Sequence, residues 1–185
     1  MNCMKIRSLF IAFLLITLVL SSCEFQCTVG KDTKEEKGKV RKEGESLLYN
    51  GIQLRASGIK VNKAYLVTND GNGERIGEDN IIDLKKGVKL LLLVSNDWKT
   101  TDDHVWLGAS MNVNTETGEK ILEQEDMFAA YEKEGLPAKD ANIIGMSVRF
   151  KEQLASLPLS YDVRFRVWDK KGEAFIEGSY TIHTR

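Results

Sequence analysis

The feature that most constrains the fold is an alternation between Val105 and Asn114, in which every second side chain is apolar and those between are Gly, Ser or Asn, apart from Trp106. Successive side chains of a β-strand point to opposite faces, so a period of two predicts a strand with one buried and one solvated face. The side chains expected to point inward are Val105, Leu107, Ala109, Met111 and Val113.

Two further segments near the C-terminus alternate in the same way. They run from Tyr161 to Val167 and from Ala174 to Ile182, and the four residues 169–172 (DKKG) separate them. A short polar loop between two alternating runs predicts a β-hairpin, with Gly172 supplying a positive φ in the loop.

The segment from Val88 to Val94 (VKLLLLV) is apolar on both faces and is bounded by Gly87 and Ser95. It is short and flanked by chain breakers, which favours a central strand covered on both sides over a helix. Further strands are expected over residues 47–56, 59–67 and 143–150, with a small extra strand over 81–84. One short helix is expected over 123–133, ended by Gly135 and Pro137.

About seven to nine antiparallel strands separated by turns imply a sandwich or a barrel. Several strands are polar on one face, which favours the sandwich. We therefore predict an all-β fold, an immunoglobulin-like antiparallel β-sandwich with one short helix. The Cys…Trp…Cys spacing of true immunoglobulin domains is absent, so this likeness concerns architecture only.

The N-terminus carries a targeting pattern. A basic start with Lys5 and Arg7 precedes an apolar run from Leu9 to Leu20, and Leu20-Ser21-Ser22-Cys23 closes it. This closing sequence resembles the lipobox of bacterial lipoproteins, in which a diacylglyceryl group is attached to the cysteine thiol and signal peptidase II cleaves before it. The alternatives are an ordinary secreted protein and an uncleaved membrane anchor, but the run has only about a dozen residues and a spanning helix needs roughly 20.

The lipoprotein resemblance implies that residues 1–22 are a signal peptide and that Cys23 carries fatty acyl chains such as palmitate. Two or more acyl chains make anchoring effectively stable. The expected location is the cell envelope, bound to a membrane through the lipid. Glu24 stands where Asp often acts as an inner-membrane retention signal, which favours the outer membrane if the cell has one.

Residues 23–45 predict a charged tether between the anchor and the domain. Lys, Arg, Glu and Asp dominate the stretch from Gly30 to Glu45, which cannot bury enough apolar surface to fold alone. The alternative is a solvated helix with charge pairs such as Lys31 with Glu35. The expected domain covers residues 46–185 and contains no cysteine, so its stability must come from a hydrophobic core.

The net charge of the chain limits the classes of partner that the sequence predicts. Removing residues 1–22 takes away Lys5 and Arg7 and leaves a formal charge of about −3. That charge does not indicate nucleic acid as a partner. The expected partners are the membrane, through the lipid anchor, and an envelope protein or glycan.

Residues 95–104 form the best candidate binding loop, because they combine three carboxylates, an imidazole and a Trp that looks exposed. Oxygen-rich loops suit Ca²⁺, and a Trp can stack on a sugar ring. The alternative is that these polar residues only form turns and that the Trp caps the core. The ligand spacing does not match the twelve-residue Ca²⁺ loop. The candidate residues are Asp97, Trp98, Asp102, Asp103 and His104.

No catalytic motif stands out. His104 and His183 lie far apart in sequence, with no nucleophile elbow and no His pair at metal spacing. Trp106 and Trp168 fall on the polar faces of their strands and are either core or an aromatic patch. We therefore predict a non-catalytic binding domain that needs no cofactor. The alternatives are a Ca²⁺-dependent carbohydrate-binding accessory and a hydrolase with a spatially assembled acid/base pair.

Overall fold

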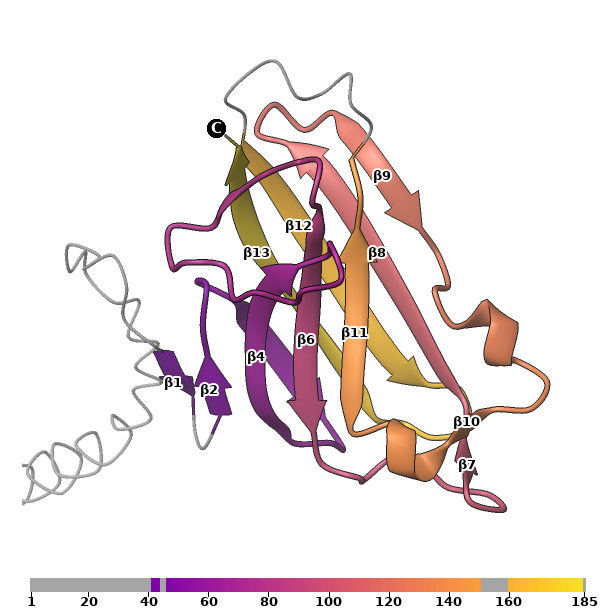
Figure 1. Ribbon diagram of the computed structural model, residues 1–185. Helices are drawn as coiled ribbons and strands as arrows, with labels where there is room; N and C mark the ends of the chain where they lie inside the picture. The colour runs from indigo at the N-terminus through magenta and orange to yellow at the C-terminus, as the bar shows by residue number, and fades with distance from the viewer. Residues whose placement is uncertain (1–40, 44–45, 151–159, 185) are drawn as a thin grey trace, which may run out of the picture. The chain divides into compact units, whose positions relative to one another are not determined.

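Two sheets packed face to face form a β-sandwich in this computed structural model (Figure 1). The structure describes residues 41–43, 46–150 and 160–184. None of the helices in these described residues is long and apolar enough to cross a membrane. The predicted signal peptide, Cys23 and most of the predicted tether lie outside the described residues.

The five-stranded sheet, which we call sheet A, contains the strand with the two-sided apolar pattern at its centre. Its order is β1 (Arg41–Glu43), β2 (Ser46–Leu48), β4 (Val61–Thr68), β6 (Val88–Val94) and β11 (Ile143–Val148). All neighbours are antiparallel except β2 and β4, which are parallel. Strand β1 falls within residues 23–45, the segment expected to be a tether. It belongs to sheet A because it pairs with β2.

The six-stranded sheet, which we call sheet B, is built around the C-terminal hairpin. Its order is β3 (Gln53–Ser57), β13 (Phe175–Thr184), β12 (Ser160–Asp169), β8 (Leu107–Thr115) and β9 (Lys120–Gln124), and β5 (Ile81–Ile82) pairs parallel with β13. A small ribbon, β7 (His104–Val105) with β10 (Leu136–Pro137), lies at one end.

The core lies between the two sheets and follows the predicted alternation. On β8, Ala109, Met111 and Val113 are fully buried, and β6 contributes Leu90 and Leu92 from the facing sheet. Burying a side chain of this size stabilises the fold by roughly 1.5–3 kcal/mol. The β-sandwich prediction and the half-buried strands are confirmed.

The central position of β6 is confirmed, but its predicted cover on both faces is only partial. One face of β6 is buried in the core, whereas Lys89, Leu91 and Leu93 remain partly exposed. The outer face of sheet A therefore keeps apolar surface in contact with solvent.

The predicted single strand over residues 47–56 is wrong, because the chain turns at Asn50-Gly51 and changes sheet. Both residues have positive φ, 58° and 61°, and the Ile52 amide donates to the Tyr49 carbonyl at 3.0 Å. Asn and Gly adopt this conformation at low cost, so the turn separates β2 in sheet A from β3 in sheet B.

The hairpin of β12 and β13 is confirmed, but Gly172 has another role than the predicted one. Its φ is not in the left-handed region; instead, a Cβ there would lie 2.5 Å from a carboxylate oxygen of Asp169. That buried carboxylate accepts hydrogen bonds from the backbone amides of Lys171 and Gly172, and from that of Lys99 at 2.7 Å. Gly172 is required because the loop closes around Asp169.

The predicted helix over residues 123–133 is wrong. Residues up to Gln124 pair with β8 as strand β9, and only a 3-10 turn follows, at Ala129–Tyr131. Tertiary hydrogen bonds override the local pattern here. The Met127 amide donates to the Ala109 carbonyl at 2.7 Å, and the Asp126 carboxylate accepts from the Phe128 amide at 2.9 Å.

Candidate functional site

The structure does not turn the predicted binding loop, residues 95–104, into an open site. Trp98, expected to be exposed, is 4% exposed, and its indole Nε1 donates to the Ala141 carbonyl at 3.1 Å. That expectation is wrong, since Trp98 is a core residue with a satisfied polar end. Asp97 accepts a hydrogen bond from the Ser95 hydroxyl.

The remaining residues of the loop form a tight turn. Asp102 and Asp103 have φ values of 50° and 59°, and Thr101 and His104 pair with each other across them. The His104 Nδ1 lies 2.7 Å from the Asp102 carbonyl oxygen. Within the described part of the chain, no three His, Cys, Asp or Glu side chains converge to hold a metal ion, so the calcium hypothesis gains no support from this loop.

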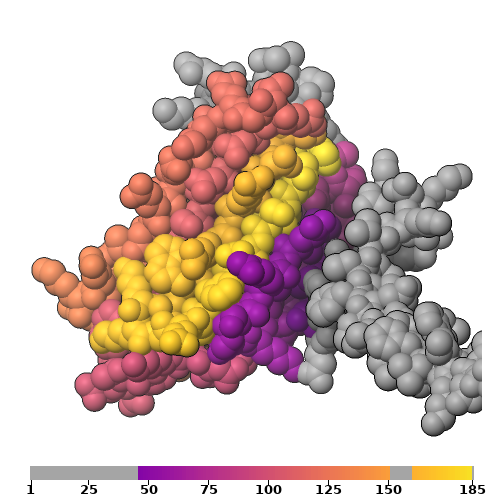
Figure 2. Space-filling view, turned by 180° about the vertical axis from the view of Figure 1, so that it is seen from behind, coloured from indigo at the N-terminus to yellow at the C-terminus, as the bar shows by residue number. Residues whose placement is uncertain are grey.

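A trough on the outer face of sheet B is the better candidate. Figure 2 shows this face, with β12 and β13 in yellow and β3 in indigo. One part of the trough has a volume of about 620 Å³ and the other about 310 Å³, and the two share Ser110, Asn112 and Arg166. The first part lies over β3, β13, β12 and β8, and the second extends to β9.

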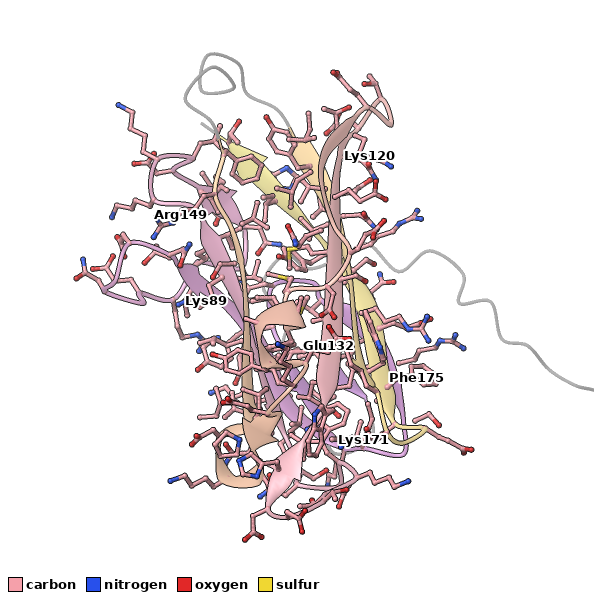
Figure 3. The ribbon with its side chains drawn as sticks, turned by 90° about the vertical axis from the view of Figure 1, so that its right-hand side faces the viewer. Lys89, Lys120, Glu132, Arg149, Lys171 and Phe175 are labelled. Carbon is pink, nitrogen blue, oxygen red and sulfur yellow. The ribbon has the colours of Figure 1, made fainter. Side chains whose placement is uncertain are left out.

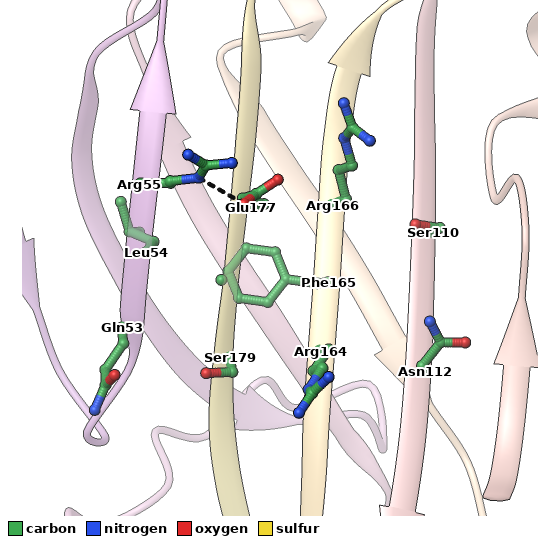
Figure 4. A pocket seen from close by; sticks show the side chains of 11 residues that line it. Gln53, Leu54, Arg55, Ser110, Asn112, Arg164, Phe165, Arg166, Glu177 and Ser179 are labelled. Atoms are coloured by element: carbon green, nitrogen blue, oxygen red, sulfur yellow. Dashed lines mark hydrogen bonds and ion pairs between the residues drawn. The ribbon is translucent and has the colours of Figure 1, made fainter.

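Cross-strand register brings these side chains together. Arg166 lies between Glu177 and Ser110, and Arg164 lies between Ser179 and Asn112. Small side chains in both rows keep the floor low between the two arginines. Gly178 lies between Glu177 and Ser179 on β13, and a Cβ there would clash with the Gln53 carbonyl oxygen and with the Phe165 ring, which Figure 4 shows next to β13.

The charge of the trough comes from its arginines. Arg55 is neutralised, because its Nε donates to Glu177 at 2.6 Å. Neither Arg164 nor Arg166 makes an ion pair with any residue that the structure describes. Two guanidinium groups are therefore available to an anion at the surface.

An aromatic surface borders the arginines. Trp168 is half-buried, and its indole occupies the space where a Cβ of Gly108 would be. The Arg166 guanidinium lies 5.9 Å from the Trp168 ring centre and 5.7 Å from that of Phe175. Trp168 thus forms part of the outer face, as does Trp106, whose ring carries the Lys171 ammonium 2.8 Å from its centre.

The β9 side of the trough is polar and carries opposite charge. Glu123 pairs with Lys120 at 2.7 Å, and Glu125 also lines this side. The Oδ1 atom of Asn112 is buried without a hydrogen-bond partner among the described residues. A buried polar atom without a partner costs free energy.

A serine and a histidine also meet on sheet B. The Ser160 hydroxyl lies 2.7 Å from His183 Nδ1, because the β12–β13 register places the two residues opposite each other. This pair was not predicted, because a loop at residues 169–172 would place Ser160 opposite Thr181, whereas the observed register places it opposite His183. No carboxylate in the described ranges hydrogen-bonds to His183, so the third element of a catalytic triad is not in place.

Comparisons with known proteins give no relative from which a function could be inferred. No family model, no curated protein and no solved structure matches this chain.

Proposed function

We propose that this protein is a lipid-anchored, non-catalytic binding module of the cell envelope that holds an acidic glycan in the trough of sheet B. The observation that carries the proposal is a pair of arginines, Arg164 and Arg166, that make no ion pair with a described residue and lie next to the Trp168 surface.

The chemistry of the trough suits a ligand that is both charged and rich in hydroxyl groups. A guanidinium group can donate two parallel hydrogen bonds to a carboxylate, sulfate or phosphate. Ser110 and Asn112 lie between the arginines and β9, within reach of sugar hydroxyls. The apolar face of Trp168 supports stacking of a sugar ring.

The open form of the trough supports binding over catalysis. Electrostatic catalysis gains most of its strength where water is excluded, whereas this trough lies across the exposed face of a sheet. A long polymer can enter such a site at any point along its length.

The trough can be tested by calorimetry with polygalacturonate, alginate and a sulfated glycan as acidic probes and dextran as the neutral probe. We expect at least one acidic probe to bind with an affinity that falls as salt rises, and dextran not to bind. Arg164→Gln and Arg166→Gln should each weaken binding by about tenfold, the loss of a charge-assisted hydrogen bond. Arg149→Gln is the matched control outside the trough and should leave the affinity within about twofold.

Three outcomes would contradict the trough proposal: no binding of any acidic probe, equal binding of dextran, or unchanged affinity in both arginine variants. The alternatives give different results in the same assay. Abolition of binding by a chelator would favour the calcium-dependent accessory, and shortening of the probe would favour the hydrolase.

The anchor is tested separately, on protein purified from its native membrane. Mass spectrometry should find Cys23 as the first residue, carrying two or three acyl chains. An unmodified N-terminus or an intact signal sequence would overturn the anchor without affecting the trough.

A further inference from the structure

The outer face of sheet A differs from the trough face in that it is partly apolar. Leu91 and Leu93 of β6 are partly exposed, and so is Tyr65 of β4. Ile143, which pairs with Leu93 on the neighbouring strand, is 57% exposed. Ile143 is the most exposed large hydrophobic side chain of the described residues.

Positive charge is mixed with this apolar surface. Lys63 contacts the rings of Tyr65 and Tyr49 at 4.9 and 5.4 Å, and Arg75 contacts those of Tyr49 and Tyr65 at 4.2 and 5.3 Å. Lys89 lies on the same face, next to Val67. Two cations therefore rest on two tyrosine rings, which orient them without neutralising them.

Among the described strands of sheet A, the one acidic residue is Glu43, on the edge strand β1. Strands β2, β4, β6 and β11 contain neither aspartate nor glutamate. Within the described ranges, Lys63, Arg75 and Lys89 make no ion pair with a carboxylate. In Figure 3, Lys89 projects on the opposite side of the sandwich from Phe175 of sheet B.

Exposed aliphatic groups, tyrosines and cations that have no carboxylate partner in the described part of the chain together match the chemistry of a membrane interface. Tyrosine is enriched at the level of lipid headgroups, and Lys and Arg are attracted to anionic lipids while their stems cover apolar surface. An acidic protein could meet the cations, but the position of the anchor favours lipid.

The chain enters sheet A at Arg41 in β1, 18 residues after Cys23. A chain of that length spans at most about 60 Å, and on average about 25 Å if flexible. An anchor at Cys23 would therefore hold the domain at a high effective concentration over the bilayer.

We propose that the outer face of sheet A docks onto the anionic phospholipid headgroups of the membrane that holds the anchor. The inference rests on the lipid anchor of the proposed function, and it is independent of the ligand in the trough.

The test uses the mature, acylated protein reconstituted in vesicles. In a Cys27→Ser background, Ile143→Cys carries an environment-sensitive fluorophore on sheet A, and Asp162→Cys carries it on sheet B as the matched control. The vesicles contain either phosphatidylcholine alone or phosphatidylcholine with phosphatidylglycerol. We expect the label at residue 143 to shift to the blue and to be quenched by brominated lipid in anionic vesicles at low salt, and the label at 162 to do neither.

Removing positive charges from sheet A tests the docking proposal quantitatively. Each Lys or Arg near an anionic surface raises partitioning by about fivefold, so the Lys63→Gln/Arg75→Gln/Lys89→Gln variant should lower the ratio of docked to undocked protein by about a hundredfold. A triple variant of exposed lysines outside sheet A removes the same charge and should change the ratio by less than about fivefold. The control substitutions are Lys120→Gln, Lys133→Gln and Lys139→Gln.

The remaining outcomes each overturn the proposal. A blue shift that persists in detergent and grows with protein concentration would show that a second copy covers the face. No shift in either vesicle, or an equal shift in both, would exclude docking to anionic lipid. Absence of acylation at Cys23 would overturn the anchor and this inference with it, whereas acylated protein without a shift would overturn the docking alone.

Discussion

Replacing Asn50 by alanine should destabilise the protein more than most single substitutions, because one buried amide holds three segments together. Its Oδ1 accepts from the Leu66 amide at 2.9 Å, and its Nδ2 donates to the Gly77 carbonyl and to Asn80 Oδ1, both at 3.0 Å. Asn80 in turn donates to the Asn50 carbonyl at 2.8 Å and to the Thr181 carbonyl at 2.7 Å. The two asparagines thus connect β4 of sheet A, the loop before β5 and β13 of sheet B.

The loss in free energy of unfolding caused by Asn50→Ala has two parts. Alanine leaves the Leu66 amide and at least one carbonyl buried without a partner, at about 1–3 kcal/mol for such a group. The backbone φ of 58° adds about 1 kcal/mol, because alanine tolerates the left-handed region less well than asparagine. Asn50→Ala should therefore lower the free energy of unfolding by about 3–5 kcal/mol, a large share of the 5–15 kcal/mol typical of a domain.

Urea unfolding measures this effect. With a slope of about 2 kcal/mol per molar, the midpoint should fall by about 2 M. Asn50→Gly loses the same hydrogen bonds, but glycine adopts the positive φ at residue 50 at low cost. It should therefore be about 1 kcal/mol more stable than Asn50→Ala. The exposed Asn72→Ala is the control, expected within about 0.5 kcal/mol of the unmodified protein. A loss below about 1 kcal/mol in Asn50→Ala would refute the assignment of these hydrogen bonds as the link between the sheets.

Three further predictions concern single contacts. Burial would raise the pKa of Asp126, but hydrogen bonds from the Lys170 ammonium and two backbone amides outweigh it and lower the pKa below the usual 3.8. Asp126→Asn should therefore cost about 1 kcal/mol at neutral pH, and the difference should shrink as pH falls below the usual carboxyl pKa of 3.8 and through the lower folded-state pKa, measured by urea unfolding. Gly108→Ala should displace the Trp168 indole, shift its fluorescence to the red and destabilise the fold by about 1–3 kcal/mol. Tyr180→Phe should leave the melting temperature unchanged or raise it, because the buried hydroxyl has no partner among the described residues and its burial raises the pKa of the phenol.

Each of these predictions has a contrary result. A pH-independent difference between the unmodified protein and Asp126→Asn would mean that its charge does not contribute. Gly145→Ala is the control for Gly108→Ala, because a Cβ at residue 145 meets no atom closer than 3.5 Å. A loss of more than about 1 kcal/mol in Tyr180→Phe would show that the hydroxyl is hydrogen-bonded.

The core could be predicted because it depends on local geometry alone. The alternation from Leu107 to Val113 follows from the pleat of one strand and needs no knowledge of its neighbours. The existence of the β12–β13 hairpin also follows from sequence, but its register does not. A loop at residues 169–172 would place Trp168 opposite Glu173, whereas Trp168 lies opposite Phe175.

The errors arose where distant hydrogen bonds override local preference. Residues 47–56 look like one strand, but the Asn50 side chain finds its partners on β4 and in the loop before β5. Residues 123–133 carry a helical pattern, but Asp126 and the Met127 amide bond to β8 instead.

Only the part of the trough that lies on β12 could be predicted from the sequence. Arg164, Arg166 and Trp168 alternate on the polar face of one strand, and that pattern is plain. Ser110 and Glu177 come from the two neighbouring strands, β8 and β13, and only the register between strands places them beside the arginines. A site on an open sheet therefore needs the pairing of strands before it can be recognised.

The two outer faces of the sandwich differ in chemistry and are separated only by the thickness of two sheets. Sheets in such folds lie about 10 Å apart, so a polymer lying along one side and a bilayer touching the other would be separated by little more than the two sheets and their side chains. With sheet A laid flat on lipid, a bound glycan chain would run parallel to the membrane plane and close above it. A domain bound on both faces in this way would hold the polymer close to the membrane instead of extending outward from it.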